Sequence, residues 1–276
     1  MNPFCCKQRP SSRAWLLVAF SAAWLSVALP VRAERLVRAC GGDAEWVPSS
    51  FFVREQGRKT ERVTGYSVDV LRAALPADYR LEVNLMPWLR CLKEVEYGKR
   101  YQIAMGLIAN EARTRVYRFS EPYQAFQPGY FYWRERRPDG VPLQSLADLS
   151  RFRVCGLLGF NYDYSGLPGA AIDTGAMDYP SLMAKLAAGR CELGLEMREV
   201  LAGRLKLGVA GVAANALLFH PLSEIPPVKA SFGISRNDAQ SERLLRDLDE
   251  GIARLRRQQR LKIMLDAYLS HGLHGG

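Results

Sequence analysis

The sequence has few of the residues from which metal and catalytic centres are built. It has six cysteines and three histidines (His220, His271 and His274) in 276 residues, and no cysteine pair has C-x-x-C spacing. A zinc site or a thioredoxin-like redox centre is therefore poorly supported. The sequence also lacks G-x-S-x-G, H-E-x-x-H and P-loop motifs, so we predict no catalytic residue, metal or cofactor. The composition is otherwise ordinary, which excludes collagen-like, low-complexity and wholly disordered chains.

Long apolar runs are also scarce, and the one present lies near the N-terminus. Ala14–Leu29 has 16 uncharged residues, follows basic residues at positions 7, 9 and 13, and is followed by Val31-Arg32-Ala33. This is the order of a cleavable signal peptide, and the run is short for a membrane span of about 20 residues. We expect removal of residues 1–33 and secretion into the periplasm.

Much of the positive charge belongs to this leader. The full chain has a net charge of +10, and residues 34–276 have +6, with 34 basic and 28 acidic residues. The remaining basic residues are scattered, and those near position 256 fit a solvated helix face. No nucleic-acid recognition module is visible, so nucleic-acid binding is not expected.

Four cysteines remain after the leader: Cys40, Cys91, Cys155 and Cys191. An even number in an exported chain favours disulfides, for which three connectivities are possible. The alternative is four buried thiols, because free cysteine is also readily buried.

The hydrophobic pattern alternates between strands and helices. Apolar runs or alternation predict strands, and apolar residues three and four apart predict helices. The predicted strands are 35–40, 80–85, 102–108, 151–157 and 191–197, and the predicted helices are 65–75, 88–97 and 180–188. This order favours an α/β fold with parallel sheets.

The order of elements occurs twice, which predicts two lobes. In both copies a helix ends at a glycine, Gly98 or Gly189, placed for the left-handed conformation, and a strand follows. Extended segments at 129–135 and 226–235 are placed to connect the lobes, and Asp238 is placed as the N-cap of an amphipathic helix, with another helix at 261–269. We expect lobe one at 34–128, a crossover at 129–137, lobe two at 138–225, and a return strand with C-terminal helices on lobe one at 226–276. A cleft between lobes is the usual ligand site.

Four segments in order resemble the bacterial extracellular solute-binding proteins of family 3, the periplasmic receptors of amino acid ABC importers. They are Gly65-Tyr66-Ser67-Val68-Asp69-Val70, the segment from Trp88 to Gly98, the segment from Asn110 through Arg113 to Phe119-Ser120-Glu121-Pro122-Tyr123, and Ser145-Leu146-Ala147-Asp148-Leu149 with Gly159. The resemblance covers nearly all of 35–269. It implies the two-lobed type II clamshell of periplasmic binding proteins, with hinge strands and an α/β unit with a parallel sheet in each lobe.

The resemblance also implies a ligand site. Arg113 stands where the family grips the ligand's α-carboxylate, a task that suits a guanidinium fork with a permanent charge. Trp88 stands where an aromatic ring stacks on the ligand. The other ligand-binding residues that we expect are Tyr66, Phe51, Trp46, Asn110, Tyr123 and Glu196.

Departures from the family pattern concern the ligand's ammonium. Gln102 replaces an acidic residue, and Gly106, Ile108 and Asn110 stand where hydroxyl residues often flank the arginine. The lobe-two aspartate falls on Met197, with Glu196 one residue away and Glu199 nearby. Neighbouring residues of a strand face opposite sides, so the ammonium site is an open question.

Within the implied fold, one disulfide in each lobe is favoured. Cys40 and Cys91 belong to lobe one, and Cys155 and Cys191 lie on strands that are neighbours in the usual order of such sheets. This pairing would leave the hinge free.

These features predict a non-enzymatic, monomeric periplasmic receptor for a small carboxylate, an amino acid or a related compound, with an ABC importer permease as its partner. Two alternatives remain. One is an enzyme of the same fold, a dehydratase acting on cyclic prearomatic acids with Glu196 as the acid. The other is a ligand-sensing receptor.

Overall fold

The computed structural model describes residues 34–208 and 213–269. The expected signal peptide lies outside the described residues. None of the described helices is long and apolar enough to cross a membrane.

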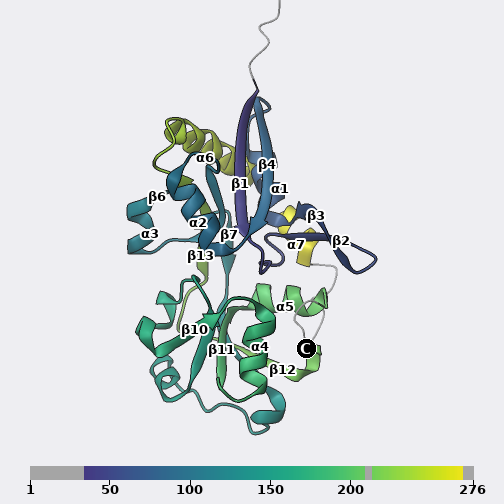
Figure 1. Ribbon diagram of the computed structural model, residues 1–276, viewed down its shortest axis with the longest axis vertical. Helices are drawn as coiled ribbons and strands as arrows, with labels where there is room; N and C mark the ends of the chain where they lie inside the picture. Colours follow the sequence, from purple (N-terminus) through teal and green to yellow (C-terminus); the bar gives the residue numbers. More distant parts are fainter. Residues whose placement is uncertain (1–33, 209–212, 270–276) are drawn as a thin grey trace, which may run out of the picture. The chain divides into compact units, whose positions relative to one another are not determined.

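The first sheet has the order β4-β1-β5-β13-β6, and β7 pairs with β13 (Figure 1). Its strands are β1 (Arg35–Gly42), β4 (Tyr79–Met86), β5 (Ile103–Ile108), β6 (Tyr117–Phe119), β7 (Gln124–Phe126) and β13 (Val228–Ser235). β1 is parallel to β4 and β5, and β13 returns antiparallel to β5. The helices that accompany this sheet are α1 (Tyr66–Ala74), α2 (Trp88–Tyr97), α3 (Glu111–Val116), α6 (Ser241–Arg257) and α7 (Arg260–Leu269). We call this unit lobe one.

The second sheet has the order β10-β9-β11-β8-β12, and we call it and its helices lobe two. Its strands are β8 (Pro128–Trp133), β9 (Val154–Leu157), β10 (Ile172–Ala176), β11 (Leu193–Met197) and β12 (Leu217–Pro221). β9 is parallel to β10 and β11, and β8 is antiparallel to β11. Its helices are α4 (Tyr179–Ala187) and α5 (Arg198–Lys206). A separate hairpin consists of β2 (Phe51–Glu55) and β3 (Arg58–Thr64). The short 3-10 helices are η1 (Arg134–Arg136), η2 (Leu146–Arg151), η3 (Asp163–Ser165), η4 (Gly169–Ala171) and η5 (Ala214–Ala216).

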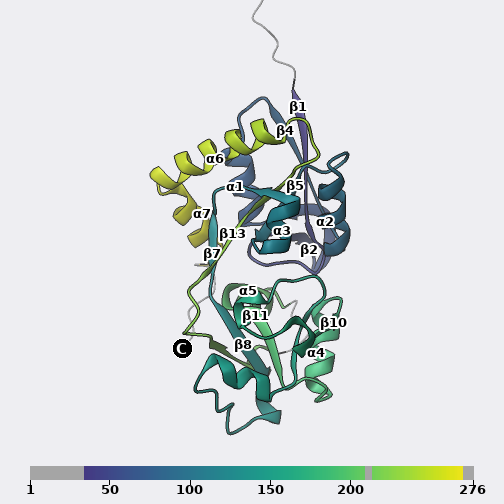
Figure 2. The ribbon, with the colours of Figure 1, turned by 90° about the vertical axis from the view of Figure 1, so that its left-hand side faces the viewer.

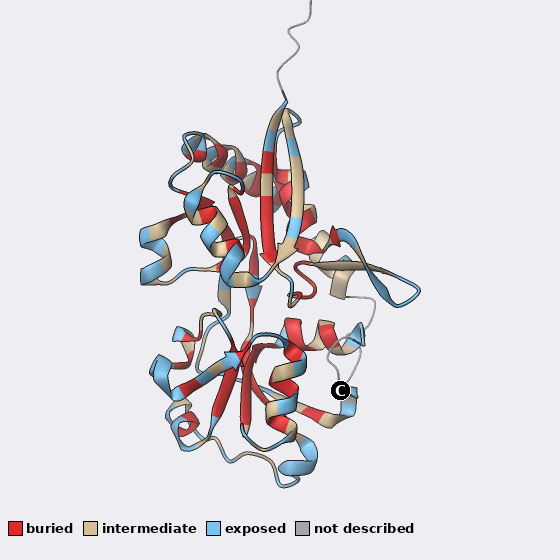
Figure 3. Ribbon diagram, in the orientation of Figure 1, coloured by how far each residue is buried: buried red, intermediate tan, exposed pale blue. Residues whose placement is uncertain are grey.

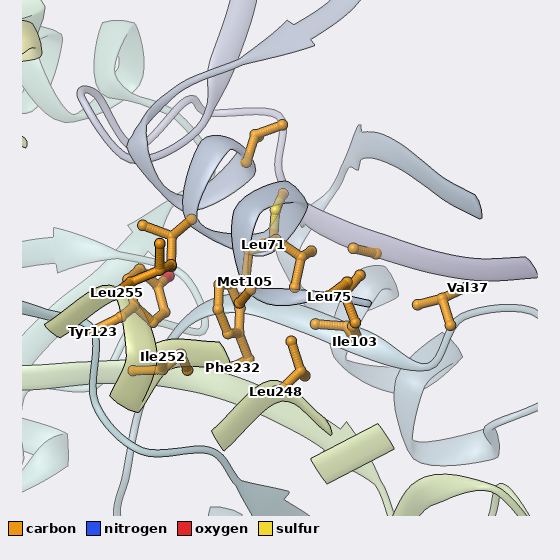
Figure 4. Packing of buried hydrophobic residues seen from close by; sticks show 14 of the residues in the cluster. Val37, Leu71, Leu75, Ile103, Met105, Tyr123, Phe232, Leu248, Ile252 and Leu255 are labelled. Atoms are coloured by element: carbon orange, nitrogen blue, oxygen red, sulfur yellow. The ribbon is translucent and has the colours of Figure 1, made fainter. Parts of the chain in front are cut away.

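Strand alternation places apolar side chains on both faces of sheet one, and Figure 3 shows buried residues along the strands of both sheets. Ile103 and Met105 of β5 pack with residues of α1 and α6, whereas Ala104 packs with residues of α2 on the other face. The cluster on the α1 and α6 face is the larger one, and Figure 4 shows Met105, Phe232, Leu248 and other members of it. Its packing fixes β5, the strand that leads to the pocket.

Two chain crossings join the sheets (Figure 2). β7 pairs in sheet one and β8 pairs in sheet two, so the first crossing falls at Gln127. The second runs from β12 to β13, through residues 222–227. Residues 129–133, expected to be part of a crossover, are instead a buried strand of sheet two, because their aromatic side chains fill the lobe-two core.

The structure pairs Cys40 with Cys91 and Cys155 with Cys191. The Cα atoms are 5.7 and 5.8 Å apart, within the range that a disulfide spans. Each bridge stays within one lobe, as expected, and neither joins the lobes to each other.

Some element ends match the sequence prediction and others differ from it. Gly98 and Gly189 are left-handed, with φ of 68° and 69°, and follow α2 and α4 as expected. Asp238 is not the N-cap of α6, which begins at Ser241 after Gln240; instead the Asp238 side chain accepts a hydrogen bond from the Gln240 amide. β9 begins at Val154 rather than Arg151, because Leu146–Arg151 forms a 3-10 helix with a Ser145 capping box.

Candidate ligand-binding site

A pocket lies where the carboxyl ends of strands from both lobes meet, the usual ligand position in α/β sheets. It has about 590 Å³ of space not filled by atoms, part of which is open to solvent. Lobe one contributes Gly42, Ala44, Glu45, Trp46, Ser50, Trp88, Met105, Gly106, Ile108 and Arg113, and lobe two contributes Phe160, Asn161, Tyr162, Tyr164, Glu196 and Met197.

Arg113 is held by a tight local turn. Asn110 is the N-cap of α3, and its side chain accepts a hydrogen bond from the Arg113 amide at 2.9 Å. The guanidinium donates from Nη1 to the Ile108 carbonyl at 2.9 Å and from Nη2 to the Gly159 carbonyl at 2.9 Å. Burial lowers the pKa of this guanidinium, but arginine keeps its charge in proteins. The pocket therefore contains a half-buried cation that donates to two neutral carbonyls and is attracted to the Asp163 carboxylate.

Trp88 begins α2 and binds the same carbonyl from a second direction. Its Nε1 donates to the Gly159 oxygen at 3.1 Å, and its ring lies 6.4 Å from that of Phe160. Near this contact the Asn110 Nδ2 donates to the Asp163 Oδ2 at 2.9 Å. Together with the hydrogen bond from Arg113 to Gly159, these two hydrogen bonds join the two lobes around the pocket.

Glu196 is the second-last residue of β11 and lies in a buried polar cluster, with 3% of its surface exposed. Its carboxylate accepts hydrogen bonds from the Tyr179 hydroxyl and, at 2.7 Å, from the Met197 amide. Burial raises the pKa of the Glu196 carboxyl, and the lowering by these hydrogen bonds and by Arg204 does not outweigh it.

A second buried carboxyl, Glu45, is charged. Its carboxylate accepts hydrogen bonds from the Phe52 amide and the Arg54 guanidinium, and it pairs with Lys59 at 3.0 Å. Burial alone would raise the pKa of Glu45, but these partners outweigh it and lower the pKa. Arg204 of lobe two stacks 3.7 Å from the Tyr179 ring centre and donates to the Glu45 backbone carbonyl at 2.8 Å.

The structure brings together Arg113, Trp88, Trp46 and Glu196 among the predicted ligand residues, since all four line the pocket. The other four lie elsewhere. Tyr66 and Tyr123 are core residues, and the Tyr66 hydroxyl donates to the Tyr123 carbonyl at 2.9 Å. Phe51 packs against Tyr268, with ring centres 6.3 Å apart, and Asn110 caps α3 beside the pocket.

Sequence reasoning missed Phe160, Tyr162 and Tyr164, which line the pocket from the loop after β9. An aromatic segment that directly follows a predicted strand was the available signal, because strand carboxyl ends form ligand sites in α/β folds. Glu45 and Met105 were also missed. A cluster of Cys155, Asp173 and Cys191 has the proximity of metal ligands, but its two sulfur atoms form a disulfide.

Comparison with known proteins gives a family match. The model of the "Bacterial extracellular solute-binding proteins, family 3" matches residues 39–271. No curated protein matches the chain.

Solved structures share the fold at low sequence identity. A substrate-binding protein of an amino acid ABC transporter from Streptococcus pneumoniae, bound to L-arginine, is 18% identical with a TM-score of 0.68, over 86% of this chain and 94% of that chain. A histidine kinase sensor domain with similarity to periplasmic binding proteins is 21% identical with a TM-score of 0.67, over 86% and 96%. An ancestral amino acid-binding protein, described as a precursor of cyclohexadienyl dehydratase, is 15% identical with a TM-score of 0.64, over 84% and 95%.

Proposed function

Because this chain belongs to the bacterial extracellular solute-binding proteins of family 3, we propose that it is a receptor that captures a small carboxylate between its two lobes. The observation that carries the proposal is Arg113, a half-buried guanidinium at the pocket that donates hydrogen bonds to the Ile108 and Gly159 carbonyls. A ligand carboxylate would take the place of the Gly159 oxygen, because a charged acceptor binds a guanidinium more strongly than a neutral carbonyl does.

The proposal also covers the location of the protein, its oligomeric state and its partner. A cleavable leader at 1–33 would deliver the chain to the periplasm, where it would act as a monomer. The ligand-bound closed state would be read by an ABC importer, in line with the transporter proteins among its structural neighbours. Loss of ligand uptake when the gene is deleted, and its restoration by the wild-type gene, is the test of this part.

The binding site is tested by calorimetry on protein freed of carried-over ligand by unfolding and refolding with its disulfides intact. Amino acids and small carboxylates are titrated into the wild type, Arg113→Gln and Arg115→Gln. Arg115 is the matched control, because it lies on the same helix but is exposed and pairs with Glu111. We expect Arg113→Gln to lose at least tenfold in affinity and Arg115→Gln to bind as the wild type. Equal affinity in all three proteins would contradict the proposal.

A second candidate function rests on Glu196. A buried carboxyl with a raised pKa, lining the same pocket as Arg113, is the form of acid that a dehydratase uses. The discriminating measurement is incubation with cyclic prearomatic acids, followed by the absorbance of the aromatic product. Turnover that Glu196→Gln abolishes would replace the receptor function, whereas the receptor predicts binding without turnover.

A further inference from the structure

The free polar atoms of the pocket are hydrogen-bond donors. Tyr164 Oη is buried and meets no hydrogen-bond partner in the described part of the chain, whereas Trp46 Nε1, which also has no partner at full hydrogen-bond distance, lies close enough to the Glu196 carboxyl to lower its pKa. An indole N–H can only donate, and a tyrosine hydroxyl has a proton to donate. Buried polar atoms are normally paired, so the Tyr164 hydroxyl, together with Arg113, is suited to a ligand that supplies acceptors.

A ligand ammonium would need the opposite chemistry, a carboxylate or several acceptors. Among the lining residues that the structure describes, Glu45 and Glu196 carry carboxyl groups. Glu45 is already neutralised by Arg54 and Lys59. The Glu196 oxygens accept from the Tyr179 hydroxyl and the Met197 amide, and burial favours the neutral form of this group.

The walls of the pocket are aromatic and aliphatic. Trp46 packs on Phe126 with ring centres 4.4 Å apart and meets the edge of Phe160 at 6.4 Å, and Phe160 also faces Trp88. Met197 occupies the end of β11, with 3% of its surface exposed. Such a surface favours an apolar body and leaves an N–H cation desolvated without a partner.

We infer that the ligand is a monocarboxylate with an uncharged, apolar body, such as an arylalkanoate, rather than a zwitterionic amino acid. The inference rests on the proposed function, because it places the carboxylate on Arg113. Among the described residues that line the pocket, Glu45 is paired with Arg54 and Lys59, and Glu196 already accepts hydrogen bonds from Tyr179 and Met197, so no lining carboxylate is left for an ammonium, whereas Arg113 is available to a carboxylate.

The experiment compares ligands that differ only in the ammonium group. 3-Phenylpropanoate is compared with L-phenylalanine, and indole-3-propanoate with L-tryptophan, by calorimetry on the refolded wild-type protein. 2-Phenylethylamine tests an amine without a carboxylate. Glycine betaine tests a quaternary cation, which aromatic rings can hold without hydrogen bonds.

We expect at least one of the two propanoates to bind, and to bind tenfold or more tightly than its amino acid. Equal or tighter binding of the amino acid, tighter binding of glycine betaine, or binding of none of these carboxylates overturns the inference. If the amino acid or glycine betaine binds more tightly, and Arg113→Gln loses that binding, the inference fails but the proposed function stands. Binding of 2-phenylethylamine alone, or carboxylate binding that Arg113→Gln leaves unchanged, contradicts the proposed function itself.

A variant pair tests the role of Met197. Met197→Asp introduces an acid at the end of β11, and we expect it to reduce the preference for 3-phenylpropanoate over L-phenylalanine at least tenfold. Met197→Leu keeps an apolar side chain of similar volume and should keep the wild-type preference. An unchanged preference in a folded Met197→Asp contradicts this role, and if that variant does not fold, the matched ligands still decide the inference.

Discussion

The Arg113 guanidinium donates across the pocket to the Gly159 carbonyl oxygen at 2.9 Å. The donor lies on α3 of lobe one, and the acceptor lies after β9 of lobe two. The residue proposed to hold the ligand is therefore also one of the contacts between the lobes. In the proposed binding mode a carboxylate on Arg113 replaces this carbonyl, which would couple ligand binding to the arrangement of the lobes.

Trp88 provides a way to test this coupling without altering Arg113. Trp88→Phe removes the indole N–H that donates to Gly159 but keeps an aromatic ring beside Phe160. A neutral hydrogen bond contributes about 1 kcal/mol, so the closed fraction of the ligand-free protein should fall about fivefold relative to the open form. Small-angle scattering should show a larger radius of gyration for this variant without ligand.

Trp133→Phe is the control for the loss of an indole, because Trp133 lies on β8 and does not line the pocket. Its scattering should match that of the wild type. Unchanged scattering for Trp88→Phe would show that the Trp88–Gly159 hydrogen bond does not hold the lobes together.

The Glu196 carboxyl predicts a pH dependence of stability. Because its pKa in the folded protein lies above the ordinary 4.5, the folded state binds the proton more tightly than the unfolded state does. The stability from this group is complete below about pH 4.5 and is lost as the pH rises through the folded pKa. The free energy of unfolding of the wild type should therefore fall relative to that of Glu196→Gln as the pH rises from 4.5.

Glu192→Gln should show the opposite trend in the same urea titrations. Hydrogen bonding from the Arg153 amide, with pairing to Arg153 and Arg137, lowers the pKa of Glu192. Its contribution is present above pH 4.5 and is lost as the pH falls through the lowered pKa. A pH-independent difference between wild type and Glu196→Gln would mean that Glu196 titrates normally in the folded protein.

The two disulfides are predicted to stabilise the lobes without shaping the pocket. Cys155 and Cys191 are separated by 36 residues and Cys40 and Cys91 by 51, so chain entropy gives each bridge about 4 kcal/mol. Cys155→Ala with Cys191→Ala should lower the free energy of unfolding in urea by about 2–4 kcal/mol, while calorimetry shows ligand affinity within about twofold of the wild type. A large loss of affinity in the folded variant would show that the bridge also positions the site.

The sequence was most informative where the local chain determines the structure. Apolar spacing located α1 and α2 to within a residue or two, and Gly98 marked the end of α2 because only its left-handed backbone closes that turn. Motif spacing predicted Arg113 at the ligand site; the structure has it at the pocket, where the Asn110 cap fixes the turn that carries it.

Long-range packing decided the rest. Tyr66 and Tyr123 are aromatic residues of the kind that line ligand clefts, but they pack within the lobe-one core. There the Tyr123 hydroxyl accepts a hydrogen bond from the Gly106 amide. Phe160 enters the pocket from the irregular segment after β9, and Tyr164 enters it from the three-residue 3-10 helix η3; both segments are too short to show a periodicity. The β2–β3 hairpin was missed because β2 is half-buried, β3 is largely exposed, and neither strand carries an apolar alternation.

The position of the Trp46 ring in the pocket wall depends on the absence of a side chain at Gly106. Its φ of +68° favours glycine, and an added Cβ would lie 2.8 Å from the Trp46 ring. That ring is packed between Phe126 and Phe160, so it cannot move aside without changing the pocket wall. Gly106→Ala should therefore lower ligand affinity at least tenfold in calorimetry and should also lower stability through both strain and overpacking.

Gly208→Ala separates these two effects. Its φ is +63°, and an added Cβ has no atom within 4 Å, so the backbone strain is similar and the steric overlap is absent. Its expected loss of stability is the strain alone, about 1–2 kcal/mol, with unchanged ligand affinity. If both variants lose the same stability and neither loses affinity, the position of the Trp46 ring beside Gly106 does not determine ligand binding.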